Sequence, residues 1–332
     1  MHQQPEVLAA LAERFAAIGK LATAVFPGSL PTGVAFLARG SSDHAALLGR
    51  YAVELNTGLP TCMVAPSLTT AYGRNPDRFR GWLLVALSQS GRTPEIVDLA
   101  QRYAAAGAKV VAITNDAESA LADAAHLAVP LHAGLEQAVP ATKTVTGQML
   151  AVLAVASGLG PGGLTQRQAA ELPEAVARVL AAAGRLEDAA RVLAGCDRLA
   201  VVGRGACYPA ALETALKLQE TTGLMAHGFS TADFRHGPIA VTGPNAPAVL
   251  LAGSGPADDD TRALRADLSQ RGAETCLLGT APEADVPWPP LGHLGEALLA
   301  TVRGQQLALA TARALHIDPD RPTGLNKVTL TH

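Results

Sequence analysis

Hydroxyl and amide side chains gather in one short stretch, between an apolar run and a helix-patterned segment, in "LLVALSQSGRTPEIVDLAQRYAAAG" at residues 83–107. They belong to Ser88, Gln89, Ser90 and Thr93. Gly91 allows a ligand to approach the backbone closely, and Pro94 suits the first position of a helix that has Thr93 as its N-cap. The exposed N–H groups and the positive end of the helix dipole then lie beside the hydroxyls, which suits a phosphate. The alternative is that the hydroxyls only cap the helix.

A second turn rich in hydroxyls follows another apolar run. In "RGSSD", residues 39–43, Ser41 and Ser42 stand at the start of a helix-patterned segment. Both turns come at the carboxyl ends of expected parallel strands, where ligands of open α/β sheets usually bind. We therefore expect Ser41 and Ser42 to reach the same crevice as the loop 88–93.

Short apolar runs alternate with helix-period segments along the chain, which is the pattern of parallel strands joined by crossover helices. We expect strands at 33–38, 61–65, 82–87, 109–114, 125–130, 199–203, 248–252 and 274–278. We expect helices at 5–25, 43–55, 95–106, 142–156, 167–185, 209–222, 261–271 and 296–316. The sequence therefore predicts an α/β fold with two parallel sheets.

The chain also carries an internal repeat. "FLARGSSDHAALLGRYAVELNTGL" from residue 36 aligns without gaps on "VVGRGACYPAALETALKLQETTGL" from residue 201, an offset of 201 − 36 = 165 residues. The shared turn and the shared helix exit favour duplication over chance similarity. The offset places the three aspartates 258–260 opposite Thr93, Pro94 and Glu95, where negative charge would repel a phosphate. We therefore expect one phosphate site per chain, in the first half.

Composition argues against several classes of protein. The chain has 332 residues and a formal net charge of −3, and no Lys/Arg cluster interleaves with aromatic residues, so we expect no nucleic-acid binding. The longest apolar helical stretch, 298–315, contains Arg303 and Arg313, so we expect no membrane span. The N-terminus shows no export signal, which predicts a cytoplasmic protein. The four cysteines are scattered, so we expect buried thiols and neither a metal nor a cofactor.

Five motifs, in one order along the chain, resemble the sugar isomerase (SIS) family. They are "ARGSSDHA", "LSQSGRT", "VGRGACYPAALETALKLQE", "FRHGP" and "GLNKVT". The resemblance is to the isomerase part of glucosamine-6-phosphate synthase and, more closely, to the single-module glucosamine-6-phosphate deaminases. It implies two duplicated SIS subdomains, each a parallel sheet flanked by helices in a flavodoxin-like three-layer sandwich. We place an N-terminal helix and subdomain 1 at 1–160, a helical linker at 161–195, and subdomain 2 with the C-terminal tail at 196–332.

The resemblance assigns the phosphate of a hexose phosphate to the four side chains of the loop 88–93, with Ser41 close by and Ser42 nearer the sugar. Glu220, at the end of "ALKLQE", resembles the general base that moves a proton between C1 and C2 of the opened sugar. Lys217 stands three residues earlier, on the same helix face, and could hold that carboxylate ionised or contact the opened sugar. The alternative for Lys217 and Glu220 is an exposed ion pair, which contributes less than about 1 kcal/mol.

Two further side chains take their roles from the resemblance. His236, in "RHGP", resembles the group that opens the sugar ring and reaches into the neighbouring subunit's site, which implies a homodimer with shared active sites. Lys327, in the tail, resembles the lysine that forms an imine with a ketose. The alternatives are a loop histidine satisfied by the backbone and a solvated lysine in a frayed tail.

Some features depart from the synthase pattern. The chain begins Met1-His2, without the amino-terminal cysteine and the glutaminase domain of the synthase, so we expect ammonia rather than glutamine to be used. Arg92 stands where the synthase usually has an acid, and Ala141 stands where it has a sugar-contacting serine. We therefore expect a glucosamine-6-phosphate deaminase/isomerase, which interconverts glucosamine 6-phosphate with fructose 6-phosphate and free ammonia.

Two other functions stay open at this point. One is isomerisation or deglycation of another sugar phosphate, and the other is sugar-phosphate sensing without catalysis. A sensor would keep the loop 88–93 and lose the reacting side chains, whereas Glu220, His236 and Lys327 are all present. The sequence therefore favours an enzyme that acts on a hexose or hexosamine 6-phosphate.

Overall fold

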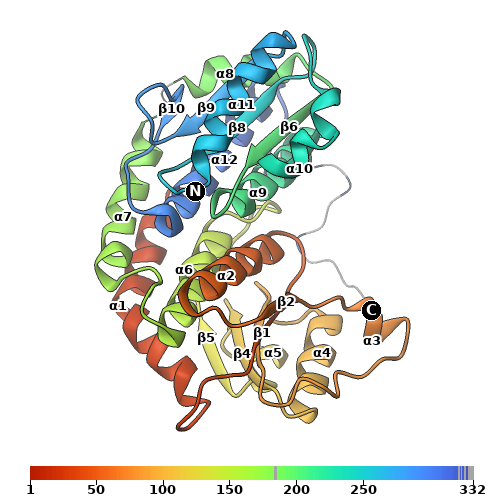
Figure 1. Cartoon of the computed structure of the whole chain (residues 1–332), viewed down its shortest axis with the longest axis vertical. Coiled ribbons are helices and arrows are strands. Elements are labelled where there is room, and N and C mark those ends of the chain that lie inside the picture. Colours follow the sequence, from red (N-terminus) through yellow and green to blue (C-terminus); the bar gives the residue numbers. More distant parts are fainter. Residues whose placement is uncertain (183–184, 321, 323, 325–326, 328–332) are drawn as a thin grey trace. The chain divides into compact units, whose positions relative to one another are not determined.

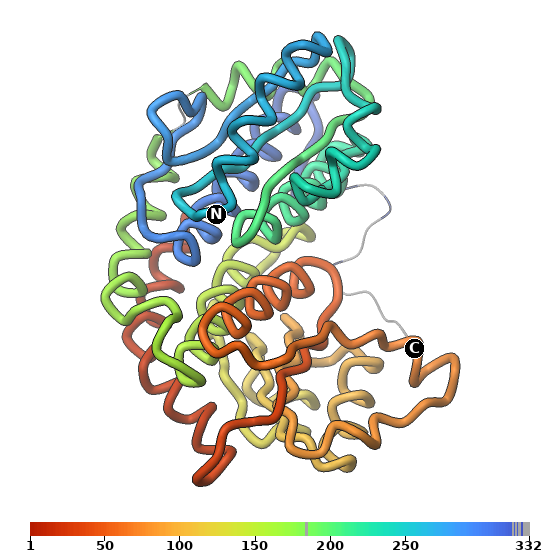
Figure 2. The backbone as a smooth tube through the Cα atoms, in the orientation of Figure 1, coloured from red at the N-terminus to blue at the C-terminus, as the bar shows by residue number. Residues whose placement is uncertain are grey.

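The structure of the chain, a computed structural model, describes residues 1–182, 185–320, 322, 324 and 327. These residues form two compact units (Figure 1), and Figure 2 follows the path of the chain through them. The N-terminal unit comprises Glu6–Glu136 and Lys143–Ala170, and the C-terminal unit comprises Met1–Pro5, Gln137–Thr142 and Glu171–Lys327. Each unit is built on one parallel sheet of five strands, which confirms the predicted fold class.

The sheet of the N-terminal unit has the strand order β2-β1-β3-β4-β5. Its strands are β1 (Val34–Leu37), β2 (Thr61–Met63), β3 (Leu83–Leu87), β4 (Lys109–Thr114) and β5 (Leu127–Pro130). The central strands β1 and β3 are buried at every residue, which explains why they appear in the sequence as continuous apolar runs. The order reverses between β1 and β3, so their carboxyl ends flank the topological switch point, where ligands of such sheets bind.

Helices cover both faces of this sheet (Figure 1). The helices in this part of the chain are α1 (Gln4–Ala24), α2 (Ser41–Thr57), α3 (Ser67–Thr70), α4 (Pro94–Ala105), α5 (Ala120–Asp123) and α6 (Lys143–Leu159). On one face α2 packs against α6, and Gly49 of α2 lies close to Phe36 of β1 and Val152 of α6. On the other face Ile96 and Leu99 of α4 join alternate strand residues in one apolar cluster.

The C-terminal unit repeats this plan, with the strand order β10-β9-β8-β6-β7. Its strands are β6 (Arg198–Gly203), β7 (Met225–Ser230), β8 (Ala248–Ala252), β9 (Thr275–Gly279) and β10 (Val286–Pro287). The remaining helices are α7 (Gln166–Ala181), α8 (Leu186–Ala194), α9 (Cys207–Thr222), α10 (Thr231–Arg235), α11 (Asp258–Gln270) and α12 (His293–Ala314), with a 3-10 turn at Pro238–Val241. α9 packs closely on α12, where Gly304 faces Thr214. Phe234 of α10 and Leu264 of α11 lie in the apolar cluster on the other side of this sheet.

The backbone reproduces the internal repeat. The offset of 165 residues carries β3 onto β8, since 83 + 165 = 248 and 87 + 165 = 252. Positive φ angles recur at corresponding glycines, with 57° at Gly40 and 56° at Gly205, and with 67° at Gly58 and 72° at Gly223. These values lie in the left-handed region that favours glycine. The repeated turn and helix exit in the sequence are therefore repeated backbone conformations.

The sequence pattern does not predict two of the strands, β7 and β10. β7 is an edge strand in which exposed and buried residues alternate over the first four positions, so no apolar run marks it. β10 has only two residues and lies at the opposite edge of the same sheet. Both edges depend on backbone pairing with a central strand, which the side-chain pattern does not reveal.

The segment predicted as a helical linker at 161–195 contains all of α7 and all of α8. From Glu171 onward these residues group with the C-terminal unit. Within the part of the chain that the structure describes, no helix is long and apolar enough to cross a membrane. Cys196 and Cys207 are buried thiols as predicted, whereas Cys62 and Cys276 are half-buried.

Candidate functional site

The loop after β3 is held by its own hydrogen bonds. Ser88 is buried, and its Oγ accepts the N–H of Gly91 over 3.2 Å. Ser90 Oγ accepts the N–H of Arg92, also over 3.2 Å. Gly91 has a φ of 62°, and a Cβ at this position would overlap the Ser119 hydroxyl, so the turn requires glycine. The loop therefore keeps a fixed shape in which backbone and hydroxyl groups are already oriented.

Thr93 is the N-cap residue of α4, and Pro94 opens the helix, as predicted. The Thr93 side chain makes no capping hydrogen bond, so its hydroxyl does not satisfy the helix start. The Gln89 carbonyl turns toward β4 and accepts the N–H of Asn115 over 3.0 Å. The capping explanation for the hydroxyls thus fails at Thr93, whose hydroxyl is available to a ligand at the start of α4.

An ion pair connects the two turns that flank the switch point. Arg39, in the turn after β1, places Nη2 2.8 Å from Oε2 of Glu95 in the first turn of α4, and the Glu95 side chain is buried. β1 and β3 are neighbours in the sheet. Ser41 and Ser42 open α2 directly after the Arg39 turn, so they lie at the same sheet edge as the loop 88–93. The structure thus brings the predicted phosphate residues to one edge.

Lys217 of α9 is surrounded by two carboxylates. Its side chain is 2% exposed, with Nζ 3.4 Å from Oε1 of Glu213 and hydrogen-bonded to Oε2 of Glu220. The Glu213 side chain is 1% exposed and that of Glu220 is 20% exposed. The three side chains share one face of the helix because they are four and three residues apart. This is a buried cluster, which excludes the alternative of an exposed ion pair.

Burial shifts the proton equilibria of this cluster. It raises the pKa of Glu220 above its ordinary value of 4.5, which the Lys217 ammonium opposes and the Glu213 carboxylate reinforces. Burial alone would lower the pKa of Lys217, but the charges of Glu213 and Glu220 outweigh it and the pKa is raised. Lys217 therefore stays protonated, while Glu220 is a better proton acceptor than an exposed glutamate.

Lys327 lies close to this cluster. Its Nζ donates to the carbonyl of Ala138 over 2.6 Å and to that of Val139 over 3.4 Å. Its charge lowers the pKa of Glu220, against the larger effect of burial. A hollow of about 400 Å³ in the same unit is lined by Lys217 and Ala138, among other residues. Three of the predicted reacting side chains, Lys217, Glu220 and Lys327, are thus brought together near a cavity.

His236 does not join this group within the described residues. It is the exposed C-cap residue of α10, and its backbone N–H donates to the Asp233 carbonyl over 3.1 Å. Within the described chain its imidazole makes no hydrogen bond or ion pair. The role that the resemblance gives to His236, in the site of a neighbouring subunit, therefore stays a prediction.

Glu213, the most deeply buried member of the cluster, was not among the residues predicted from the sequence. The signal was present, because Glu213 precedes Lys217 by four residues on a helix, which is the spacing of an ion pair. The carbonyls of Ala138 and Val139 that receive Lys327 gave no such signal. Every residue has a backbone carbonyl, so the residue types do not indicate which one accepts a hydrogen bond from a distant lysine.

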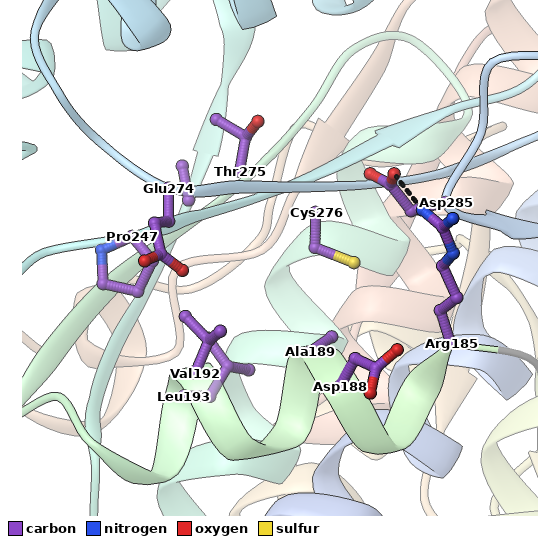
Figure 3. A pocket seen from close by; sticks show the side chains of 11 residues that line it. Arg185, Asp188, Ala189, Val192, Leu193, Pro247, Glu274, Thr275, Cys276 and Asp285 are labelled. Carbon is purple, nitrogen blue, oxygen red and sulfur yellow. Dashed lines mark ion pairs between the residues drawn. The ribbon is translucent and has the colours of Figure 1, made fainter.

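A second hollow, of about 280 Å³, lies against α8 at the amino ends of β8 and β9 (Figure 3). Figure 3 shows the Cys276 thiol between β9 and α8, and Arg185 facing Asp285 across 3.8 Å. None of the predicted site residues lines this hollow. Burial raises the pKa of Cys276 to about 12, and the Asp285 carboxylate adds to the shift. The thiol is therefore protonated at neutral pH and a weak nucleophile.

Known proteins share both sequence and fold with this chain. It is 31% identical over 312 residues to the glutamine–fructose-6-phosphate aminotransferase of Zymomonas mobilis, in a match that covers 89% of this chain and 51% of that protein. A Silicibacter pomeroyi structure, assigned as a phosphosugar isomerase, matches with a TM-score of 0.87 and 29% identity over 96% of this chain and 97% of the other. The glucosamine-6-phosphate deaminase structure from Thermotoga maritima matches with a TM-score of 0.75 and 22% identity, covering 98% of this chain and 100% of the other, and shows the shared fold.

The chain spans about half the length of the curated relatives that it matches. The family model of the SIS domain matches residues 33–158 and 192–286, one segment in each unit. The relatives and structural neighbours of this chain include proteins named as sugar-phosphate isomerases and deaminases. Together with the duplicated sheets and the loop at the switch point, these matches show that the chain belongs to the SIS domain family.

Proposed function

We propose that the chain is a glucosamine-6-phosphate deaminase/isomerase, which converts glucosamine 6-phosphate and water to fructose 6-phosphate and free ammonia, or catalyses the reverse reaction. One observation carries the proposal. Glu220 is a partly exposed carboxylate of raised pKa, held by the buried Lys217. Such a group suits the transfer of a proton between adjacent carbons. The sugar-phosphate activities of the relatives support the substrate class.

The phosphate of the substrate is assigned to the loop 88–93 and the start of α2. Hydroxyls of Ser90 and Thr93 and the N–H groups at the start of α4 would donate to its oxygens, and the helix dipole adds a favourable field. Ser41 would contribute from α2, and Ser42 would face the sugar. This assignment is supported by the shape of the loop and by the Thr93 hydroxyl, which makes no cap bond.

In the proposed reaction Glu220 removes the proton from C2 of the opened amino sugar and delivers it to C1. The enolamine formed in between becomes a ketose imine, and water then replaces the nitrogen at C2, so that ammonia leaves. Lys217 keeps the Glu220 carboxylate in place and balances its charge. Lys327, whose charge lowers the pKa of Glu220, is the candidate amine for an imine with C2 of the ketose, which would form with loss of water.

We propose that the nitrogen is released as free ammonia in one direction and taken from free ammonia in the other. The test is ammonia released from glucosamine 6-phosphate by the purified chain, with glutamine and fructose 6-phosphate as the comparison. Ammonia release without use of glutamine supports the proposal. Binding of the sugar phosphate with no ammonia would favour another substrate or a sensing role.

The phosphate assignment is tested separately by titration calorimetry. Ser90→Ala and Thr93→Ala should each weaken binding of the sugar phosphate by about 1.5–3 kcal/mol, because a bond to a charged group is lost. Ser29→Ala, an exposed hydroxyl in the same unit, is the control and should bind as the wild type does. Unchanged affinity in both loop variants would defeat the assignment.

A homodimer with shared sites is part of the proposal. It rests on the role that the resemblance gives to His236, the exposed C-cap residue of α10. If His236 serves the site of the other subunit, then mixing His236→Ala chains with Glu220→Gln chains should restore part of the activity, because one hybrid site receives both groups. An active enzyme that sediments as a monomer would contradict this part of the proposal.

A further inference from the structure

The loop after β8 corresponds, through the offset of 165 residues, to the loop after β3. In this second loop a carboxylate is already bound. Glu296, in the first turn of α12, is 0% exposed, and its Oε2 accepts the N–H of Ser254 over 2.6 Å. Its Oε1 accepts the Ser254 hydroxyl over 2.7 Å and the N–H of Leu291 over 2.9 Å. Three donors therefore converge on one buried anion that belongs to the chain itself.

The carboxylate fits tightly against the loop. Gly253 occupies the position that corresponds to Ser88, and a Cβ on Gly253 would overlap Oε2 of Glu296. Asp258, which opens α11, is also buried and accepts the N–H of Gly255 over 2.8 Å. Two carboxylates of the chain itself, Glu296 and Asp258, therefore occupy neighbouring N–H groups of this loop.

Two of the three aspartates that the sequence predicts to repel a phosphate are paired with arginines. Asp260 forms ion pairs with Arg204 and Arg235, and Asp259 forms one with Arg262. Much of their charge is thus balanced locally. Direct occupation by Glu296 is the stronger reason why this loop would not take a phosphate.

We propose that the C-terminal unit contains a closed oxyanion site, in which the Glu296 carboxylate takes the place that a substrate phosphate takes in the N-terminal unit. The analogy rests on the proposed phosphate binding at the loop 88–93. If the Glu296 side chain is removed, we expect a small carboxylate to bind in its place. With Glu296 in place, each chain would bind one sugar phosphate, and the second loop would stay in its anion-bound conformation at all times.

The test is chemical rescue of Glu296→Ala. This substitution removes the atoms of one acetate, so acetate should bind in the space and restore the lost hydrogen bonds. At an acetate concentration about ten times its dissociation constant, the folding equilibrium of the variant should shift about tenfold toward the folded state, compared with equal chloride. The measurement is urea unfolding of wild type and variant in matched acetate and chloride buffers.

Glu296→Gln is the matched control, because its amide fills the same space without a charge and should gain nothing from acetate. A folded Glu296→Ala protein that acetate stabilises no more than it stabilises the wild type would overturn the proposal. If Glu296→Ala does not fold in chloride, recovery of folded protein in acetate supports the proposal, and failure in both salts contradicts it. Anion binding at the loop 88–93 affects wild type and variant alike, so failure of the proposed function would leave this difference unchanged.

Discussion

Replacement of Lys217 by methionine should destabilise the chain strongly. The substitution leaves the Glu213 carboxylate, 1% exposed, without the ammonium that lies 3.4 Å away. Removing one partner of a buried ion pair costs about 3–5 kcal/mol, because a charge stays in a medium that solvates it poorly. Glu213→Gln should cost less, about 1–2 kcal/mol, because Lys217 keeps its bond to Glu220.

Urea unfolding at neutral pH measures both costs, and the double variant Glu213→Gln/Lys217→Met measures their coupling. We expect the double variant to be less destabilised than the sum of the two single variants, since it contains no uncompensated Glu213 charge. Costs that simply add, or a Lys217→Met cost below about 1 kcal/mol, would show that the cluster is solvated and would refute the reasoning.

Glu213→Gln should also change the pH dependence of catalysis. Glu213 raises the pKa of Glu220, so its neutralisation should lower that pKa. If ionised Glu220 is the base, activity falls when it is protonated, and the acid limb of kcat/KM should move to lower pH in the variant. An acid limb that stays in place would separate Glu220 from the proton transfer.

Three further results are expected. Gly49→Ala should lower the free energy of unfolding in urea by about 1–2 kcal/mol, because its Cβ would overlap Val152 and the gain in helix propensity offsets only part of that strain. The control Gly243→Ala, which has open space around its Cβ, should be near neutral. Equal costs in the two variants would contradict this packing. Alkylation of Cys276 by iodoacetamide should keep rising about tenfold per pH unit toward pH 12, whereas a plateau near pH 9 would mean an unburied thiol. The folded-state pKa of Glu220 is raised, so its contribution to stability is largest below about pH 4.5 and declines as the pH rises through the raised pKa. Glu220→Gln should remove that decline from the curve of stability against pH. An unchanged curve would contradict the raised pKa.

Much of the fold could be predicted because its signals are local. β3 lies wholly in the core, so its run of five apolar residues marked it, and the turn at Gly40 was repeated at Gly205. β7 escaped because an edge strand with alternating exposure has no apolar run. An edge is defined by its pairing partner, which lies elsewhere in the sequence.

The residues of the candidate site likewise include some that the sequence predicts and some that it does not. The loop 88–93 could be predicted because hydroxyls, a glycine and a proline are contiguous and each has a local structural effect. Glu296 could not, because it lies 42 residues after the Ser254 that donates to it, and a glutamate in a helical first turn usually indicates a solvated end. Burial of such a group depends on tertiary packing, which no spacing in the sequence encodes.

The central claim is that Glu220 transfers the proton between C1 and C2 of a sugar phosphate. Exchange of the C2 proton of glucosamine 6-phosphate for deuterium, followed by NMR in heavy water, tests it most directly. We expect the wild type and the exposed control Glu174→Gln to exchange this proton, and Glu220→Gln to bind the sugar phosphate without exchanging it. Exchange at the wild-type rate in Glu220→Gln, or no exchange by a wild type that binds the sugar, would contradict the claim.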